Sequence, residues 1–361
     1  MKGRQVDPGL TGNYGFMDQR AAMKFIHDNI AVFGGNPKSE SDPYFQQLIV
    51  ESNPFTLPYQ TTFSSSLLAD VTAELLDCPH SDLECLRGKP VEDVVAAGNA
   101  AGEKIILDLY GPLHLFEPWG PVIDDKEITD NPLNAYRDGK FQNKPVMIGT
   151  VTEEGRMYMW ESFETKPAKI EVDAFFALIF GVEESFRIFQ RYNFTKFDDL
   201  REPMSTAATD YVFVCSTLNA SRLLSLGSSS NIYHYVFDHA LSFPSVWGPN
   251  YTECYGHVCH GSELPFVWRS VSLRNYKFTK EEQQLAESIT NYWGNFAHTG
   301  DPNDDSWKDE SKRKQDFIKW PTYDKNTGWQ GMLFQSSGNK VQSKYREPFC
   351  RFLDDIGYTP K

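Results

Sequence analysis

Residues 145–155 read Pro-Val-Met-Ile-Gly-Thr-Val-Thr-Glu-Glu-Gly, an apolar run that turns polar at its end. A short continuous apolar run of this kind is typical of a strand that is buried on both faces. In parallel α/β sheets, functional side chains gather beyond the carboxyl ends of the strands. A carboxylate on the loop that follows, from Glu153 or Glu154, can therefore orient an imidazole.

Two other segments, residues 45–52 and 231–237, also have the character of buried strands. Residues 165–225 are mostly helical in pattern. Strands separated by long helical stretches predict a largely parallel sheet that is covered by helices. Because no Pro/Gly/Ser-rich linker and no internal repeat divides the chain, we expect a single domain over residues 1–361.

Two helices are marked by their sequence patterns. Apolar residues recur at spacings of three and four over residues 12–33, and a Gly-Gly-Asn-Pro sequence then stops the pattern. The clearest helix spans residues 279–298, where Thr279 and Glu282 form a capping box and Gly300 marks the end. Its apolar stripe can pack internally or form a contact between two copies of the chain.

A second candidate catalytic loop, Gly-His-Val-Cys-His-Gly-Ser-Glu-Leu-Pro at residues 256–265, lies downstream of the strand at 231–237. It supplies His257 and His260. Acid before histidine is the order that α/β-hydrolases use after their nucleophilic serine.

Several motifs along the chain resemble those of a known family. Gly-Asn-Tyr-Gly-Phe-Met-Asp-Gln-Arg-Ala-Ala at residues 12–22 is similar to the helix N-x-G-x-x-D-Q-x-x-A-L of the carboxylesterase type B family. This family includes cholinesterases, carboxylesterases and neuroligin-like adhesion proteins. The stretch 29–37 resembles its N-I-x-x-F-G-G-D-P sequence, with Asn36 in place of the usual Asp. Further similar segments lie at residues 118–124, 145–150, 293–303 and 320–324, so the resemblance runs from about residue 11 to about residue 353.

The resemblance implies an α/β-hydrolase fold whose family activity is hydrolysis of small-molecule carboxylic esters without a cofactor. Residue by residue, it places Glu154 as the triad acid and His260 as the general base. The acid would hold the imidazole tautomer and stabilise the imidazolium that forms. Glu153 is then expected to be a solvated neighbour.

The nucleophile of the triad is absent from this sequence. In the family, the strand after G-G-D-P leads into a G-x-S-x-G elbow that lifts the serine above the sheet and supplies one oxyanion-hole amide. Here Pro37 is followed directly by a charged junction, and the sequence from Tyr44 already resembles the part beyond the elbow helix; no G-x-S-x-G occurs in the 361 residues. Ser39 and Ser41 lie at the junction, but the neighbouring prolines and charges favour a loop over an elbow. The glycine-rich oxyanion segment of the family precedes the position of Gly12, and the printed sequence begins after it.

We therefore expect a hydrolase-type chain that does not hydrolyse esters. The N-terminal strands and the nucleophile strand of the family sheet are missing, so the fold is expected to be incomplete, with an unpaired strand edge and exposed apolar faces. One explanation is a truncated, exon-skipped or mispredicted gene product of an active esterase. Another is a genuine non-catalytic derivative, such as an adhesion or scaffold protein of the neuroligin-like kind.

Six cysteines are present. The resemblance implies a disulfide between Cys78 and Cys85 and a long-range disulfide between Cys215 and Cys350. Three states are open for the remaining pair, Cys254 and Cys259: a local disulfide, free thiols, or a metal site. For a metal site, the ligands would be Cys254, His257, Cys259 and His260, but this spacing is too compact for all four to bind tetrahedrally.

Composition limits the partners and the compartment. A formal net charge of −14 argues against nucleic acid as a default partner, and no run approaches the roughly 20 apolar residues of a membrane span. The printed N-terminus has no apolar region of a signal peptide. The even number of cysteines and three N-glycosylation sequons, at Asn193, Asn219 and Asn250, nevertheless favour a secreted or extracellular lineage.

Overall fold

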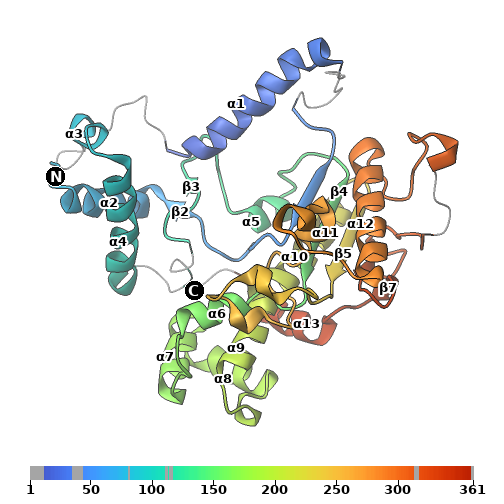
Figure 1. Ribbon diagram of the computed structural model, residues 1–361. Helices are drawn as coiled ribbons and strands as arrows, with labels where there is room; N and C mark the ends of the chain where they lie inside the picture. The colour runs from blue at the N-terminus through green and yellow to red at the C-terminus, as the bar shows by residue number, and fades with distance from the viewer. Residues whose placement is uncertain are drawn as a thin grey trace.

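A computed structural model describes residues 12–34, 44–79, 82–109, 113, 117–312 and 317–358. Its centre is a five-stranded sheet in the order β1-β4-β5-β6-β7 (Figure 1). The first four strands are parallel and β7 is antiparallel to β6. The strands are β1 (Leu48–Glu51), β4 (Val146–Val151), β5 (Ile232–Phe237), β6 (Gln330–Phe334) and β7 (Lys340–Ser343).

The three strands expected from apolar runs are present as β1, β4 and β5. Every residue of β4 and β5 is buried, because helices cover both faces of these central strands. The sequence pattern did not indicate β6 and β7. The edge strand β7, Lys-Val-Gln-Ser, contains one apolar residue and cannot be distinguished from a loop by periodicity.

Helices account for most of the remaining described chain. They are α1 (Tyr14–Asn29), α2 (Thr62–Leu75), α3 (Leu83–Arg87), α4 (Val91–Leu109), α5 (Pro132–Arg137), α6 (Arg156–Ser162), α7 (Lys169–Phe180), α8 (Val182–Arg191), α9 (Arg201–Ala208), α10 (Cys215–Gly227), α11 (Leu264–Trp268), α12 (Lys280–Thr299) and α13 (Glu347–Ile356). A π-helical segment, Thr209–Val214, joins α9 to α10. A separate two-stranded sheet pairs β2 (Gln60–Thr61) in parallel with β3 (Val122–Ile123).

The alternation of side chains along β4 divides the core between the two faces of the sheet. Val146 and Ile148 pack in the cluster that includes residues of α10 and α13, whereas Met147 and Val151 pack with residues of α11 and α12. Helix α12 begins after the expected capping box, with the Thr279 hydroxyl accepting from the amide of Glu282. Its apolar stripe is buried within the chain: Leu285, Ile289, Tyr292, Trp293 and Phe296. This stripe therefore packs internally.

Helix α1 lacks a core of its own. None of its residues is buried; Phe25 is 64% exposed, and Phe33 in the 3-10 turn Ile30–Phe33 that follows is 77% exposed. Its N-terminus is tied to the β3 region by Asn13, whose side chain donates to the carbonyl of Val122 and accepts from the Val122 amide. Figure 1 shows α1 and the group α2–α4 standing apart from the five-stranded sheet.

Strand β1 forms the other exposed feature. Within the described sheet it pairs with β4 alone, and Leu48 is exposed while the other three residues are half-buried. An apolar edge strand and an uncovered amphipathic helix are the features expected of an incomplete α/β sheet. Such surfaces favour association and aggregation.

Three disulfides join the six cysteines. Cys78 bonds to Cys85 and Cys215 to Cys350, the pairs that the family resemblance implies. The second pair is fully buried, links α10 to α13 across 135 residues of sequence and contributes about 2–5 kcal/mol to stability. Among the states open for the remaining pair, the structure has the local disulfide, Cys254–Cys259. In the part of the chain that the structure describes, no helix combines the length and apolar character needed to cross a bilayer.

Candidate active site

The acid loop begins where β4 ends. The amide of Val151 donates to Oε1 of Glu154 at 2.8 Å, so the last strand residue fixes the carboxylate that follows it. Gly155 then packs against α9, where an added Cβ would lie 2.8 Å from the carbonyl oxygen of Ser205. Only glycine fits at this contact, which explains why glycine follows the acid.

Glu154 and His260 form a hydrogen-bonded pair. The carboxylate is completely buried, and its Oε2 accepts from Nδ1 of His260 at 2.6 Å. A proton held on Nδ1 leaves Nε2 of the imidazole available as a base. The structure thus brings together the two residues that the sequence places on separate loops, 106 residues apart.

The environment of His260 changes its pKa in opposing directions. Burial lowers the pKa, because the charged imidazolium loses hydration. The hydrogen bond and negative charge of Glu154 outweigh this effect, so the pKa of His260 is raised above its usual value. A histidine held in this way is a stronger base than a free imidazole.

A mostly apolar cavity of about 340 Å³ lies beside His260. The rings of Tyr158 and Phe213 lie 5.7 and 5.3 Å from the imidazole, measured between ring centroids. Other lining residues include Phe175, Phe176, Phe180, Ile179, Met204 and Tyr211. The volume and the aromatic lining suit a small apolar organic group.

Glu263 is a buried acid that the sequence analysis missed. Burial, followed by the negative charge of Glu154, raises the pKa of Glu263 to about 8. Within the described residues, its Oε2 and the hydroxyls of Ser52 and Ser262 have no hydrogen-bond partner among the protein atoms. The sequence places this acid three residues after His260 but gives no other indication of it. A Glu in a loop is ordinarily solvated, so its burial could not be expected.

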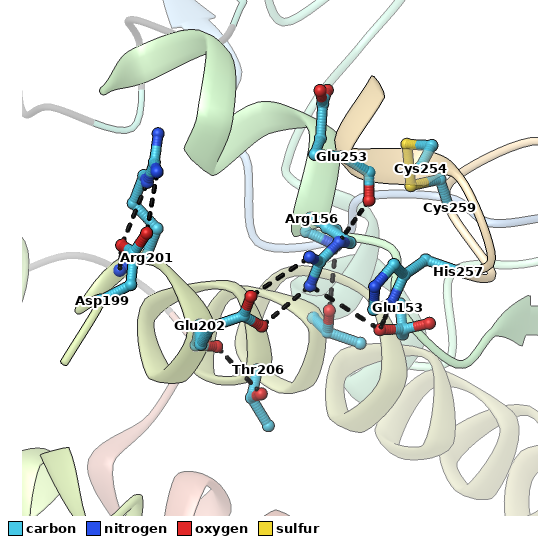
Figure 2. A network of polar contacts seen from close by, with 12 residues as sticks. Glu153, Arg156, Asp199, Arg201, Glu202, Thr206, Glu253, Cys254, His257 and Cys259 are labelled. Atoms are coloured by element: carbon cyan, nitrogen blue, oxygen red, sulfur yellow. Dashed lines mark hydrogen bonds and ion pairs between the residues drawn. A yellow bond between two sulfur atoms is a disulfide. The ribbon is translucent and has the colours of Figure 1, made fainter. Parts of the chain in front are cut away.

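Glu153 remains partly solvated, with a side chain that is 34% exposed, but it also has partners that the sequence did not indicate. Its carboxylate accepts from Nδ1 of His257 at 2.8 Å (Figure 2). It also accepts from the amide of Val258 at 2.8 Å. The sequence did not indicate these partners, because they arise where the loop that supplies both donors, residues 254–260, folds back onto the acid loop. Sequence spacing contains no information about this contact.

In the described part of the chain, no serine completes the pair. Among the residues that the structure describes, no side-chain hydroxyl forms a hydrogen bond with His260. Ser39 and Ser41 lie outside the described residues. Within the described residues, the pair is therefore an acid and a base without a positioned nucleophile.

The overall arrangement is similar to that of a solved hydrolase. PNB esterase superposes with a TM-score of 0.73 over 96% of this chain and 70% of its own, at 22% sequence identity. A mostly parallel sheet flanked by helices, with an acid and a histidine beyond the strand ends, defines the α/β-hydrolase fold, as predicted.

The carboxylesterase family matches residues 4–41 and 38–353, and the chain belongs to this family. The two matched segments meet at residues 38–41, the junction at which the sequence passes over the elbow. Cocaine esterase of Homo sapiens is 26% identical over 384 aligned residues, covering 96% of this chain and 63% of the relative. Neuroligin-2 of Homo sapiens is 25% identical over 82% of this chain and 39% of its own length. The chain thus spans less than two thirds of either relative, and the cocaine esterase alignment is longer than the 361 residues of the chain.

Proposed function

We propose that this chain is a serine carboxylesterase from which the nucleophile has been lost, and that it does not hydrolyse esters. Glu154 is assigned as the triad acid and His260 as the general base for a small-molecule carboxylic ester. The observation that carries the proposal is the 2.6 Å hydrogen bond between Glu154 and His260 beside the apolar cavity.

The chemistry of the pair explains the expected loss of activity. In a serine esterase the base removes a proton from the serine hydroxyl, and the oxyanion hole stabilises the tetrahedral intermediate. Without the serine, the imidazole has no alkoxide to generate. Removal of a triad nucleophile typically costs about 10⁴- to 10⁶-fold in rate.

A fluorophosphonate probe tests this proposal, because such probes label serines that a neighbouring base activates. We expect no labelling of the purified chain under conditions that fully label an intact serine esterase. Mass spectrometry of the treated chain would reveal any adduct. A labelled serine that disappears in the His260→Ala variant would refute the proposal.

A non-catalytic adhesion or scaffold role is the second candidate. The missing elbow and the similarity to neuroligin-2 favour it. It predicts saturable binding of the purified protein to cell surfaces, undiminished by the substitutions Glu154→Gln and His260→Ala. The intact acid–base pair is not required by such a role, and for this reason we place the esterase lineage first.

We further propose a secreted or extracellular lineage, supported by three disulfides and by the sequons. Asn193 and Asn250 are exposed, in a left-handed turn and in a loop. Asn219 differs, because it is half-buried in α10. Its side-chain Nδ2 donates to Oδ1 of Asp354 at 3.4 Å.

We therefore expect glycans on Asn193 and Asn250 and none on Asn219 when the chain is produced in a secretory host. Glycopeptide mass spectrometry after enzymatic deglycosylation would measure the occupancy of each site. Asn193→Gln and Asn250→Gln should each remove one glycan's mass, and Asn219→Gln should leave the glycosylated mass unchanged apart from the residue difference. Occupancy of Asn219 would contradict the packing of α10 against α13.

A further inference from the structure

The histidine loop, defined here as residues 254–260, has its internal shape fixed by a disulfide. Cys254 and Cys259 are both buried and are separated by five residues in sequence. So short a cross-link constrains the loop itself but does not determine where the loop lies relative to Glu154. Other contacts must hold it there.

Glu153 makes three of these contacts. Its carboxylate accepts from His257 Nδ1 and from the Val258 amide, each at 2.8 Å, and its own amide donates to the carbonyl of Val258 at 3.2 Å. Glu153 thus joins the histidine loop to the acid loop one residue before the triad acid. Its side chain is only 34% exposed, so these hydrogen bonds are partly shielded from water.

Arg156, at the start of α6, holds the residue that immediately precedes the histidine loop. Its Nε donates to the carbonyl of Glu253 at 2.7 Å, and its two terminal nitrogens donate to the carboxylate of Glu202 at 2.8 and 3.1 Å (Figure 2). One terminal nitrogen also lies 4.0 Å from Oε1 of Glu153. The side chain is 8% exposed and stacks over Trp160. A planar guanidinium with these partners connects α6, α9 and the residue that immediately precedes the histidine loop.

We propose that Glu153 and Arg156 are positioning residues that set the distance between His260 and Glu154. Glu154 is buried, and its Oε1 is anchored by the amide at the end of β4. The alignment of the pair therefore depends on the placement of the histidine loop, and Glu153 is the side chain that ties this loop to the strand end. The positioning role rests on the proposed role of His260 as the base. The contacts of Glu153 and Arg156 described above, here called the clamp, can be tested without measuring ester hydrolysis.

Isotope-labelled protein and two readouts test the clamp. The first is the titration of His260 followed by histidine side-chain NMR, with His260→Ala used to identify its resonances. The second is hydrogen exchange of the Val258 amide. For Glu153→Ala we expect the pKa of His260 to fall toward that of a buried histidine without its acid, because the Glu154 interaction that raises it is weakened. We also expect the Val258 amide to exchange about 10- to 100-fold faster, since a hydrogen bond to a charged group is lost.

Matched variants separate positioning from general damage. Glu153→Gln keeps an acceptor for the Val258 amide, so we expect its exchange rate to stay within a few-fold of the wild type. Arg156→Met should shift the His260 titration in the same direction by a smaller amount. Glu184→Ala removes a similar acid, paired with Arg187 within α8 and with no contact to the histidine loop, and should change neither readout.

An unchanged His260 titration and Val258 exchange in folded Glu153→Ala protein would overturn the proposal, as would equal changes in Glu184→Ala. If Glu153→Ala does not fold, the titration of His260 in Arg156→Met decides the proposal, and an unshifted value overturns it. Neither readout uses ester hydrolysis or serine labelling. The clamp can therefore fail while the esterase lineage stands, and the reverse also holds.

Discussion

Insertion of the strand, elbow and helix of an intact carboxylesterase between Pro37 and Tyr44 is expected to give a chain that hydrolyses p-nitrophenyl esters. The expected rate is about 10⁴-fold or more above that of the same graft with its serine replaced by alanine, because a triad nucleophile is worth that much. The inserted strand would pair with the open edge of β1, and its helix would cover apolar surface that is now exposed. Steady-state kinetics on the purified graft would measure the gain. The graft carries the donor's glycine-rich oxyanion segment as well, ahead of Gly12, because the elbow supplies only part of the oxyanion hole.

The graft also tests the two residue assignments. His260→Ala in the active graft should remove essentially all of the gained activity, and Glu154→Gln should remove about 10⁴-fold by allowing the wrong tautomer. Glu282→Gln, a buried acid in α12 that is remote from the triad in sequence and caps a helix, should leave kcat of the folded graft unchanged. A graft that hydrolyses esters equally well without His260 would show that another base serves the reaction.

Glu263→Gln is expected to change the free energy of unfolding differently at different pH. The variant should gain about 3–5 kcal/mol of stability relative to the wild type between pH 4 and alkaline pH. The pKa of Glu263 is raised to about 8, so the folded state binds this proton more tightly than the unfolded state does. The wild type therefore loses stability as the pH rises from the ordinary carboxyl value, near 4.5, through about 8. Each unit of that interval corresponds to about 1.4 kcal/mol, and glutamine has no proton to lose. Chemical denaturation of both proteins at pH 4, 6, 8 and 9 would measure the divergence.

Glu282→Gln provides a control of opposite sign. Burial raises the pKa of Glu282, but hydrogen bonds from His239, Ser242 and Thr279 outweigh it, and the net pKa is lowered. Its ionised form stabilises the folded state above the ordinary carboxyl pKa, and this contribution is lost as the pH falls through the lowered value. The substitution should therefore destabilise the protein at neutral pH and become less harmful in acid.

The Glu263 prediction would be contradicted if the free energy of unfolding of the wild type and of Glu263→Gln changed in parallel with pH. Such a result would show that Glu263 is ionised at little cost in the folded state.

Strands β4 and β5 could be predicted because they are buried on both faces, and β1 was predicted from the same kind of apolar run although it is a half-buried edge strand. Continuous apolar runs gave β1, β4 and β5, and capping residues marked α12. Strand β7 escaped prediction because its polar edge sequence has no distinctive period. The helical period of α1 was also correctly predicted, although its apolar side chains are exposed in the structure. Periodicity reports local conformation and says nothing about whether a partner surface is present.

The sequence by itself determined the family, the order of acid and histidine, and the loss of the G-x-S-x-G elbow, because these properties reside in residue identity and chain order. Tertiary structure alone decided three features of the site. It joined Glu154 to His260 at 2.6 Å, it removed Glu263 from water, and it gave the partly exposed Glu153 its hydrogen bonds to the histidine loop. Each of these depends on how two loops about 100 residues apart pack at the ends of β4 and β5. Burial and contact at that range arise from the assembled sheet, and no local pattern encodes them.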